Sequence, residues 1–242
     1  MEYEYQRLFV TGDTHGEIGR FGRNTFLEMV LKEKDILFIT GDFGFVWNDS
    51  KEEQEKRKML ASKKYTICFL DGNHENFHLL NQYPEEVWCG GKAQVIERDE
   101  DGIPKVIHLM RGQIYEVAGK KIFTMGGASS IDRYLREEGK SWWPEEMTTD
   151  EQHLEALKNL EANGNKVDYI LTHAARELYM ETMFGRKRNE KEKPLNNFLQ
   201  YVFDSVEFKH WYFGHLHEDR DLSKKETVLW FEVRNMETNE CI

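Results

Sequence analysis

Five short apolar runs in this chain each end in a small residue or turn that is followed at once by a metal-ligand side chain. The segments are Thr11-Gly-Asp-Thr-His15, Thr40-Gly-Asp42, Asp71-Gly-Asn-His74, Leu171-Thr-His173 and Phe213-Gly-His-Leu-His217. A glycine before the ligand lets the backbone turn sharply and approach other groups closely. Because α/β proteins gather their ligands at the ends of strands, we expect these side chains to lie together at one edge of a sheet.

The pattern along the chain predicts an α/β protein. Apolar runs at 7–10, 35–40 and 65–70 are predicted strands, and the segments between them predict helices near 26–31 and 51–64. Turns at 101–102 and 118–119 predict β-hairpins, and Thr148 or Thr149 is expected to cap a helix. Further strands are predicted at 167–171, 210–213 and 227–233. We therefore expect residues 1–242 to form a single domain, with a mixed sheet or two sheets packed together.

Charge and composition limit the class of protein. The net charge of -11 argues against nonspecific coating of duplex nucleic acid, although bound cations can supply positive charge locally for a phosphate ester. No apolar run approaches the roughly 20 residues that a membrane span needs. Cys68, Cys89 and Cys241 are odd in number and widely spaced, so we expect reduced thiols in a cytoplasmic protein.

The ligand types in the five segments point to catalytic metals. They provide imidazole, carboxylate and amide groups without thiolate, a set that suits manganese, iron or zinc. One metal needs fewer ligands, whereas two metals bridged by a carboxylate would use them all. Each segment alone has an ordinary structural interpretation, since Gly-Asp after a strand is a common turn. Their order, each at the end of a predicted strand, favours the two-metal interpretation.

In this order the segments resemble the motifs of the calcineurin-like metallophosphoesterase superfamily: Gly-Asp-x-His, Gly-Asp, Gly-Asn-His-Glu, a lone His and Gly-His-x-His. They extend from Gly12 to His217, about the whole chain. The resemblance implies a metallophosphoesterase-type sandwich, in which two mixed β-sheets are packed together and flanked by helices. It implies a dimetal site along one edge of the sheets, where a metal-bridging hydroxide would attack a phosphodiester or phosphomonoester.

The resemblance also implies a role for each matching residue. Seven side chains match ligand positions: Asp13, His15 and His217 for the first metal, Asn73, His173 and His215 for the second, and Asp42 as the bridge. His74 would lie beside the scissile phosphate as a catalytic group, where it would stabilise or protonate the leaving oxygen. The expected cofactors are two divalent ions, with manganese first and iron, zinc or nickel as alternatives.

One motif departs from the Ser/Thr protein phosphatases of the superfamily. Those carry Gly-Asp-x-x-Asp-Arg-Gly in the second segment, whereas this chain has Gly41-Asp42-Phe43-Gly44-Phe45-Val46-Trp47. The acid that would orient His74 and the arginine that would hold phosphate are both absent from those positions. This weakens the interpretation as a protein phosphatase and leaves open which residue supports His74.

A further segment, from Gly126 to Glu146, resembles one in bacterial and phage members of the superfamily. It predicts a pocket wall with these substrate residues: Arg133 or Arg136 on a phosphate, and Trp142 or Trp143 against a base or ring. In the alternative interpretation the tryptophans pack the loop and the arginines are solvated or paired with neighbouring glutamates.

The leading hypothesis is an enzyme that hydrolyses a small or nucleotide-like phosphate ester. His74 favours diesters, because alkoxide leaving groups gain most from a proton donor. One alternative is a nuclease for single-stranded ends, which the acidic charge disfavours. Another is a non-catalytic scaffold, which the complete set of ligand positions disfavours. The metal, the substrate and the oligomeric state stay open.

Overall fold

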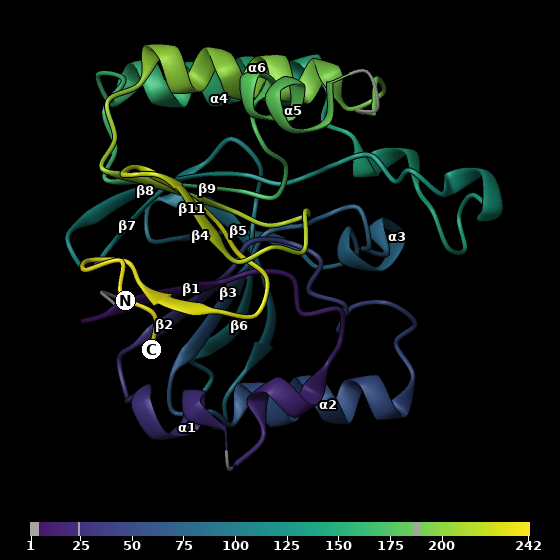
Figure 1. Ribbon diagram of the computed structural model, residues 1–242. Coiled ribbons are helices and arrows are strands. Elements are labelled where there is room, and N and C mark those ends of the chain that lie inside the picture. The colour runs from purple at the N-terminus through teal and green to yellow at the C-terminus, as the bar shows by residue number, and fades with distance from the viewer. Residues whose placement is uncertain (1–4, 24, 186–188) are drawn as a thin grey trace.

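The computed structural model describes residues 5–23, 25–185 and 189–242, and within them two β-sheets pack face to face between two layers of helices (Figure 1). The larger sheet has the order β13 (Val233–Asn235), β1 (Leu8–Thr11), β2 (Ile36–Ile39), β3 (Thr66–Phe69), β6 (Pro104–Leu109), β5 (Gly91–Arg98) and β4 (Glu85–Trp88). The smaller sheet has the order β11 (Arg220–Ser223), β12 (Glu226–Val228), β10 (His210–Phe213), β9 (Tyr169–Thr172), β8 (Lys120–Met125) and β7 (Ile114–Val117). The predicted arrangement of two mixed sheets flanked by helices is confirmed.

The central strands of both sheets are parallel. In the larger sheet β1, β2, β3 and β6 pair in this way, and in the smaller sheet β8, β9, β10 and β12 do so. The predicted hairpins are confirmed as antiparallel pairs, β5 with β6 and β7 with β8. Parallel strands bring their carboxyl ends to one edge of a sheet, so the loops after β1, β2, β3, β9 and β10 can meet there.

Helices cover the outer face of each sheet (Figure 1). The larger sheet is covered by α1 (Phe26–Val30) and α2 (Lys51–Ala61), and the smaller one by α4 (Asp150–Ala162), α5 (Glu177–Phe184) and α6 (Lys193–Ser205). Short helical turns lie in the connections: η1 (Ile18–Phe21), α3 (Phe77–Leu80), η2 (Arg133–Leu135) and η3 (Pro144–Glu146). Within the described ranges, each helix is too short or too polar to cross a membrane.

The strands read as continuous apolar runs because both of their faces are buried. In β2, Ile36 and Phe38 pack between the two sheets, whereas Leu37 and Ile39 pack beneath the helices with Leu60 of α2. This alternation follows from the two-residue repeat of a strand. The sandwich therefore has three apolar layers, one between the sheets and one beneath each helical layer.

The single closing strand predicted at 227–233 is wrong. The chain forms β12 in the smaller sheet and β13 in the larger one, with a bend between them. The carboxylate of Asp219 accepts hydrogen bonds from the backbone N–H groups of Trp230, Phe231 and Glu232 at 2.7, 3.0 and 3.0 Å. These bonds hold the bend, so the apolar run passes from one sheet to the other instead of continuing.

His210, at the start of β10, makes the stability of the fold depend on pH. Its ring is buried, with Nε2 2.8 Å from the hydroxyl of Thr227, and burial lowers the pKa of His210 to about 4. The unfolded chain takes up this proton near pH 6.5, so the free energy of unfolding should fall as the pH drops from 6.5 toward 4, with a loss of about 2 kcal/mol at pH 5. His210→Gln should remove that part of the loss. Urea unfolding of the metal-free proteins at pH 7.5 and 5 measures it, and equal losses in both proteins would contradict the assignment.

Candidate metal centre

The seven predicted ligands all follow strands whose carboxyl ends share one edge of the sandwich. They lie after β1 (Asp13 and His15), β2 (Asp42), β3 (Asn73), β9 (His173) and β10 (His215 and His217). The glycines before them permit close approach. A Cβ on Gly41 would lie 2.1 Å from Nδ1 of His173, and one on Gly72 would lie 2.1 Å from Oδ1 of Asp42. These contacts require glycine, since no side chain fits there.

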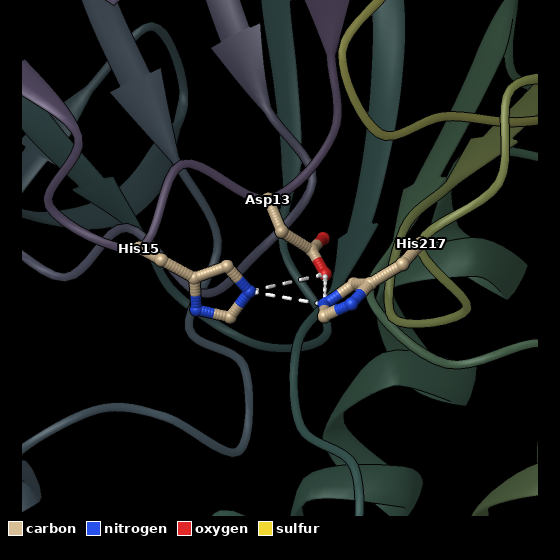
Figure 2. A group of neighbouring side chains, drawn as sticks. All are labelled: Asp13, His15 and His217. Carbon is tan, nitrogen blue, oxygen red and sulfur yellow. Dashed lines mark hydrogen bonds and ion pairs between the residues drawn. The ribbon is translucent and has the colours of Figure 1, made fainter. Parts of the chain in front are cut away.

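Asp13, His15 and His217, here called the first ligand group, converge on one point (Figure 2). The Nε2 atoms of the two histidines are 3.0 Å apart, and Oδ2 of Asp13 is 3.3 Å from Nε2 of His217 and 3.9 Å from Nε2 of His15. The indole of Trp230 stacks on His217 with ring centroids 5.0 Å apart. Two imidazole nitrogens and a carboxylate oxygen at this spacing form a donor set suited to a divalent cation.

Asn73 and His173 belong to the second ligand group, which also includes His215. Nδ1 of His173 lies 2.8 Å from the backbone carbonyl oxygen of Thr40, which accepts the ring proton. Nε2 is then a lone-pair atom, and it faces Oδ1 of Asn73 at 3.2 Å and Oδ1 of Asp42 at 3.5 Å. Three lone-pair atoms facing one another can be held together by a cation between them, so these residues also fit a metal.

Asp42 lies between the two groups. Its Oδ2 is 3.9 Å from Nε2 of His15, and its Oδ1 is 3.5 Å from Nε2 of His173. The carboxylate is buried, and the backbone N–H of His74 donates to Oδ1 at 2.7 Å. Burial would raise the pKa of Asp42, but the nearby imidazoles of His173, His74 and His15 outweigh it and lower this pKa.

Sequence analysis did not identify the partner of His215, which is Glu192 at the start of α6. Nε2 of His215 lies 3.2 Å from Oε2 of Glu192, a carboxylate that also accepts from the backbone N–H of Ser129 and the amide of Asn196. Burial opposes both charges, yet their attraction lowers the pKa of Glu192 to about 2 and raises that of His215 to about 9. With Nε2–H directed at Glu192, Nδ1 is the ring nitrogen available to a metal.

Four of the candidate ligands have strained backbones. The φ angles of His15, Asp42, His215 and His217 are 46°, 47°, 67° and 52°, in the left-handed region that favours glycine. Such conformations cost about 1 kcal/mol or more each and persist where the surrounding structure holds them. Hydrogen bonds help to stabilise these conformations, because the backbone N–H groups of Thr14 and His15 both donate to the carbonyl of Asp42.

His74 is supported by an arginine. Nη1 of Arg136 lies 3.0 Å from Nδ1 of His74, and Asp132 holds the guanidinium at 2.8 Å. Arginine only donates, and Nη2 of Arg136 also lies 3.4 Å from Nε2 of His74, so the shorter contact at Nδ1 favours a lone pair there and the proton of neutral His74 on Nε2. Burial lowers the pKa of His74, Asp42 opposes this shift, and Arg136 adds to it. Arg136 therefore occupies the supporting position that the sequence left open.

The other predicted substrate residues lie apart from the ligands. Trp143 is buried against Trp47 and His78, with ring centroids 5.3 and 6.0 Å away. Trp142 lies beneath the guanidinium of Arg133, at 5.4 Å. These contacts agree with the interpretation in which the tryptophans pack the loop, and substrate contact by either stays a prediction.

Two cavities adjoin the centre, and His74 lines both. The larger one, about 490 Å³, is lined by candidate ligands and by the apolar residues Ile131, Met180, Phe184 and Leu216. The smaller one, about 390 Å³, is more polar and includes His15, Trp47 and Lys56. Both volumes are in the range of small-molecule sites.

Comparison with known families agrees with this geometry. A family model described as calcineurin-like phosphoesterase matches residues 6–219. The chain belongs to the calcineurin-like phosphoesterase family. The resemblance noted from the motifs is thereby confirmed. No curated protein matches the sequence.

Two solved structures are similar in fold at low identity. One is a candidate 5'-nucleotidase from Staphylococcus aureus in complex with alpha-ketoglutarate, with 14% identity, a TM-score of 0.48, and coverage of 92% of this chain and 48% of that one. The other is the phosphopantetheinyl hydrolase PptH from Mycobacterium tuberculosis, with 14% identity, a TM-score of 0.42, and coverage of 95% and 89%. This chain spans about half the length of the first protein. At these scores neither likeness bears on the substrate.

Proposed function

We propose that residues 1–242 form one domain that holds two metal ions and hydrolyses a phosphodiester or phosphomonoester bond in a small or nucleotide-like substrate. The position of Asp42 carries the proposal, because its two oxygens face the two ligand groups separately. A carboxylate in that position can bridge two cations. A site for a single metal would not need a bridging carboxylate. Membership of the family supports the same class of reaction.

Two divalent ions in this centre would activate a water molecule and clamp the phosphoryl oxygens. The residues of the chain supply the rest of the proposed mechanism. His74, with its proton on Nε2, would donate a hydrogen bond to the leaving oxygen and stabilise its developing charge, while Arg136 favours this tautomer and adds positive charge beside the phosphate. A hydrogen-bond donor beside the leaving oxygen supports a preference for diesters with poor leaving groups.

The larger cavity supports a substrate with an apolar or ring-shaped portion. Its lining combines candidate ligands with Ile131, Met180, Phe184 and Leu216, so such a group would pack against these apolar residues while the phosphate lies at the metals. Manganese is the proposed metal, with iron, zinc or nickel as alternatives. The cytoplasmic location and the lack of nonspecific binding along duplex nucleic acid, both expected from the sequence, stay predictions.

The function is tested by hydrolysis of bis(p-nitrophenyl) phosphate, p-nitrophenyl phosphate and an alkyl phosphodiester. We expect that chelation abolishes turnover, that Mn²⁺ restores it, and that restoration requires two Mn²⁺ per chain. His74→Ala should slow the alkyl ester by about 10²-fold and the p-nitrophenyl esters less, because the alkoxide carries more localised charge for the hydrogen bond from His74 to stabilise. Turnover that is independent of metal, or restored fully by one ion per chain, would contradict the dinuclear proposal.

A further inference from the structure

A buried hydrogen-bond relay reaches the amide of Asn73 from the segment that sequence analysis expected to be a pocket wall. Nδ2 of Asn73 donates to the hydroxyl oxygen of Ser130 at 3.1 Å. The hydroxyl of Ser130 donates to Oε2 of Glu146 at 2.7 Å, and the backbone N–H of Ser130 donates to Oε1 of Glu146 at 2.9 Å. All three residues are buried, and Glu146 is 0% exposed. The relay is thus shielded from water that could replace its bonds.

The direction of the relay follows from the number of protons available. The hydroxyl of Ser130 has one proton, and Glu146 accepts it while its other oxygen accepts the backbone N–H. The Ser130 oxygen can then only accept, so Asn73 must turn its NH₂ toward it. This leaves Oδ1 of Asn73 facing Nε2 of His173. A side-chain amide can otherwise turn over and exchange its oxygen and nitrogen.

We infer that Glu146 is a positioning residue for the second metal: acting through Ser130, it fixes which end of the Asn73 amide faces the metal centre. A metal binds the oxygen of an amide and not its NH₂, so the wrong orientation removes a ligand. The inference rests on the proposed dinuclear centre. It assigns to the segment 129–147 a role in metal binding in addition to any contact with substrate.

An isosteric change at Glu146 should reverse the relay. In Glu146→Gln the amide oxygen must still accept from the N–H of Ser130, so its NH₂ takes the place of Oε2 and donates to the Ser130 hydroxyl. The Ser130 proton must then turn toward Asn73, which presents its oxygen to Ser130 and its NH₂ to Nε2 of His173. This arrangement satisfies every hydrogen bond without a metal, and it opposes metal binding at the second site.

The test is Mn²⁺ binding to metal-free protein, measured by equilibrium dialysis with metal analysis. Wild type should bind two ions, and Glu146→Gln should bind the second at least about 10-fold more weakly, with the first affinity unchanged. Ser130→Ala removes the hydroxyl that orients the Asn73 amide but does not force the amide into the opposite orientation. It should therefore weaken the second site less than Glu146→Gln does. Asn73→Asp combined with Glu146→Gln should regain the second ion, because a carboxylate has an oxygen at both ends.

The outcomes separate this inference from the proposed function. Two ions bound by wild type and by Glu146→Gln with equal affinity would overturn the inference, and so would a greater loss in Ser130→Ala than in Glu146→Gln. If wild type binds fewer than two ions, the dinuclear proposal itself fails. Glu226→Gln, which changes a buried carboxylate bonded to Arg176, is the matched control and should bind both ions as wild type does. If Glu146→Gln does not fold, Ser130→Ala decides alone: a loss of a few fold at the second site supports the inference, and no loss or a loss above about 10-fold overturns it.

Discussion

Replacing Asp42 by asparagine is expected to lower kcat/KM for phosphate-ester hydrolysis by at least about 10³-fold. Asparagine has the same size, but it replaces one carboxylate oxygen by NH₂, which cannot bind a metal. Since Oδ1 and Oδ2 of Asp42 face different ligand groups, either orientation of the amide removes a ligand from one group. Loss of the charge stabilisation by one metal is worth several kcal/mol, and about 4 kcal/mol corresponds to the stated factor.

The measurement for Asp42→Asn is steady-state hydrolysis at saturating Mn²⁺, together with the number of ions bound. Asp168→Asn is a suitable control, because Asp168 accepts a backbone hydrogen bond from Lys121 at the opposite end of β9. The control should keep activity within a few fold of wild type. An Asp42→Asn variant that binds two ions and retains more than a tenth of the activity would contradict the bridging role.

Arg111→Leu is expected to lower the free energy of unfolding by about 3–5 kcal/mol, because it leaves a buried carboxylate without its cation. The guanidinium of Arg111 donates to Oδ2 of Asp71 through Nε at 2.8 Å and through Nη2 at 2.5 Å, and both side chains are buried. Burial opposes the charge on Asp71, but Arg111 and His108 hold the pKa of that carboxyl well below its usual range. Without Arg111 the charge loses most of this compensation.

Urea unfolding of the metal-free protein measures the loss. Arg98→Leu is the matched control, because Arg98 forms an exposed ion pair with Glu86 at 2.7 Å. It should cost less than about 1 kcal/mol. Combining Arg111→Leu with Asp71→Asn should recover much of the stability, since no buried charge is then left unpaired. A loss in Arg111→Leu as small as in the control would show that the buried pair contributes little.

The features of the fold that could be predicted depend on local patterns in the sequence. The strands β1, β2, β3, β9 and β10 were predicted because runs buried on both faces must be apolar along their whole length. The hairpin turns were predicted because glycine marks the tight connection in each. The candidate ligands were found because each follows such a strand directly. Their assignment to two metals stays a proposal that the geometry supports.

The partners of the ligands could not be predicted, because they lie far away in the sequence. Glu192 is 23 positions from His215, and Glu146 is 73 positions from Asn73, as their numbers give (215 − 192 and 146 − 73). Nothing in the residues around a buried glutamate states which distant side chain it will contact. Arg136 illustrates the same limit, since its contact with His74 depends on how the segment after β8 folds back over the site.

By itself, the sequence determined the strands that carry the motifs, the order of the motifs and the chemistry of the candidate ligands, because hydrophobic period and residue type act locally. Only the tertiary structure decided that the run 227–233 divides between two sheets and that Trp143 is buried in the loop. It also decided that Glu192 contacts His215 and that Glu146 contacts Asn73 through Ser130. These features depend on which surfaces meet when the two sheets pack. A buried polar group takes whichever partner that packing brings within hydrogen-bond distance.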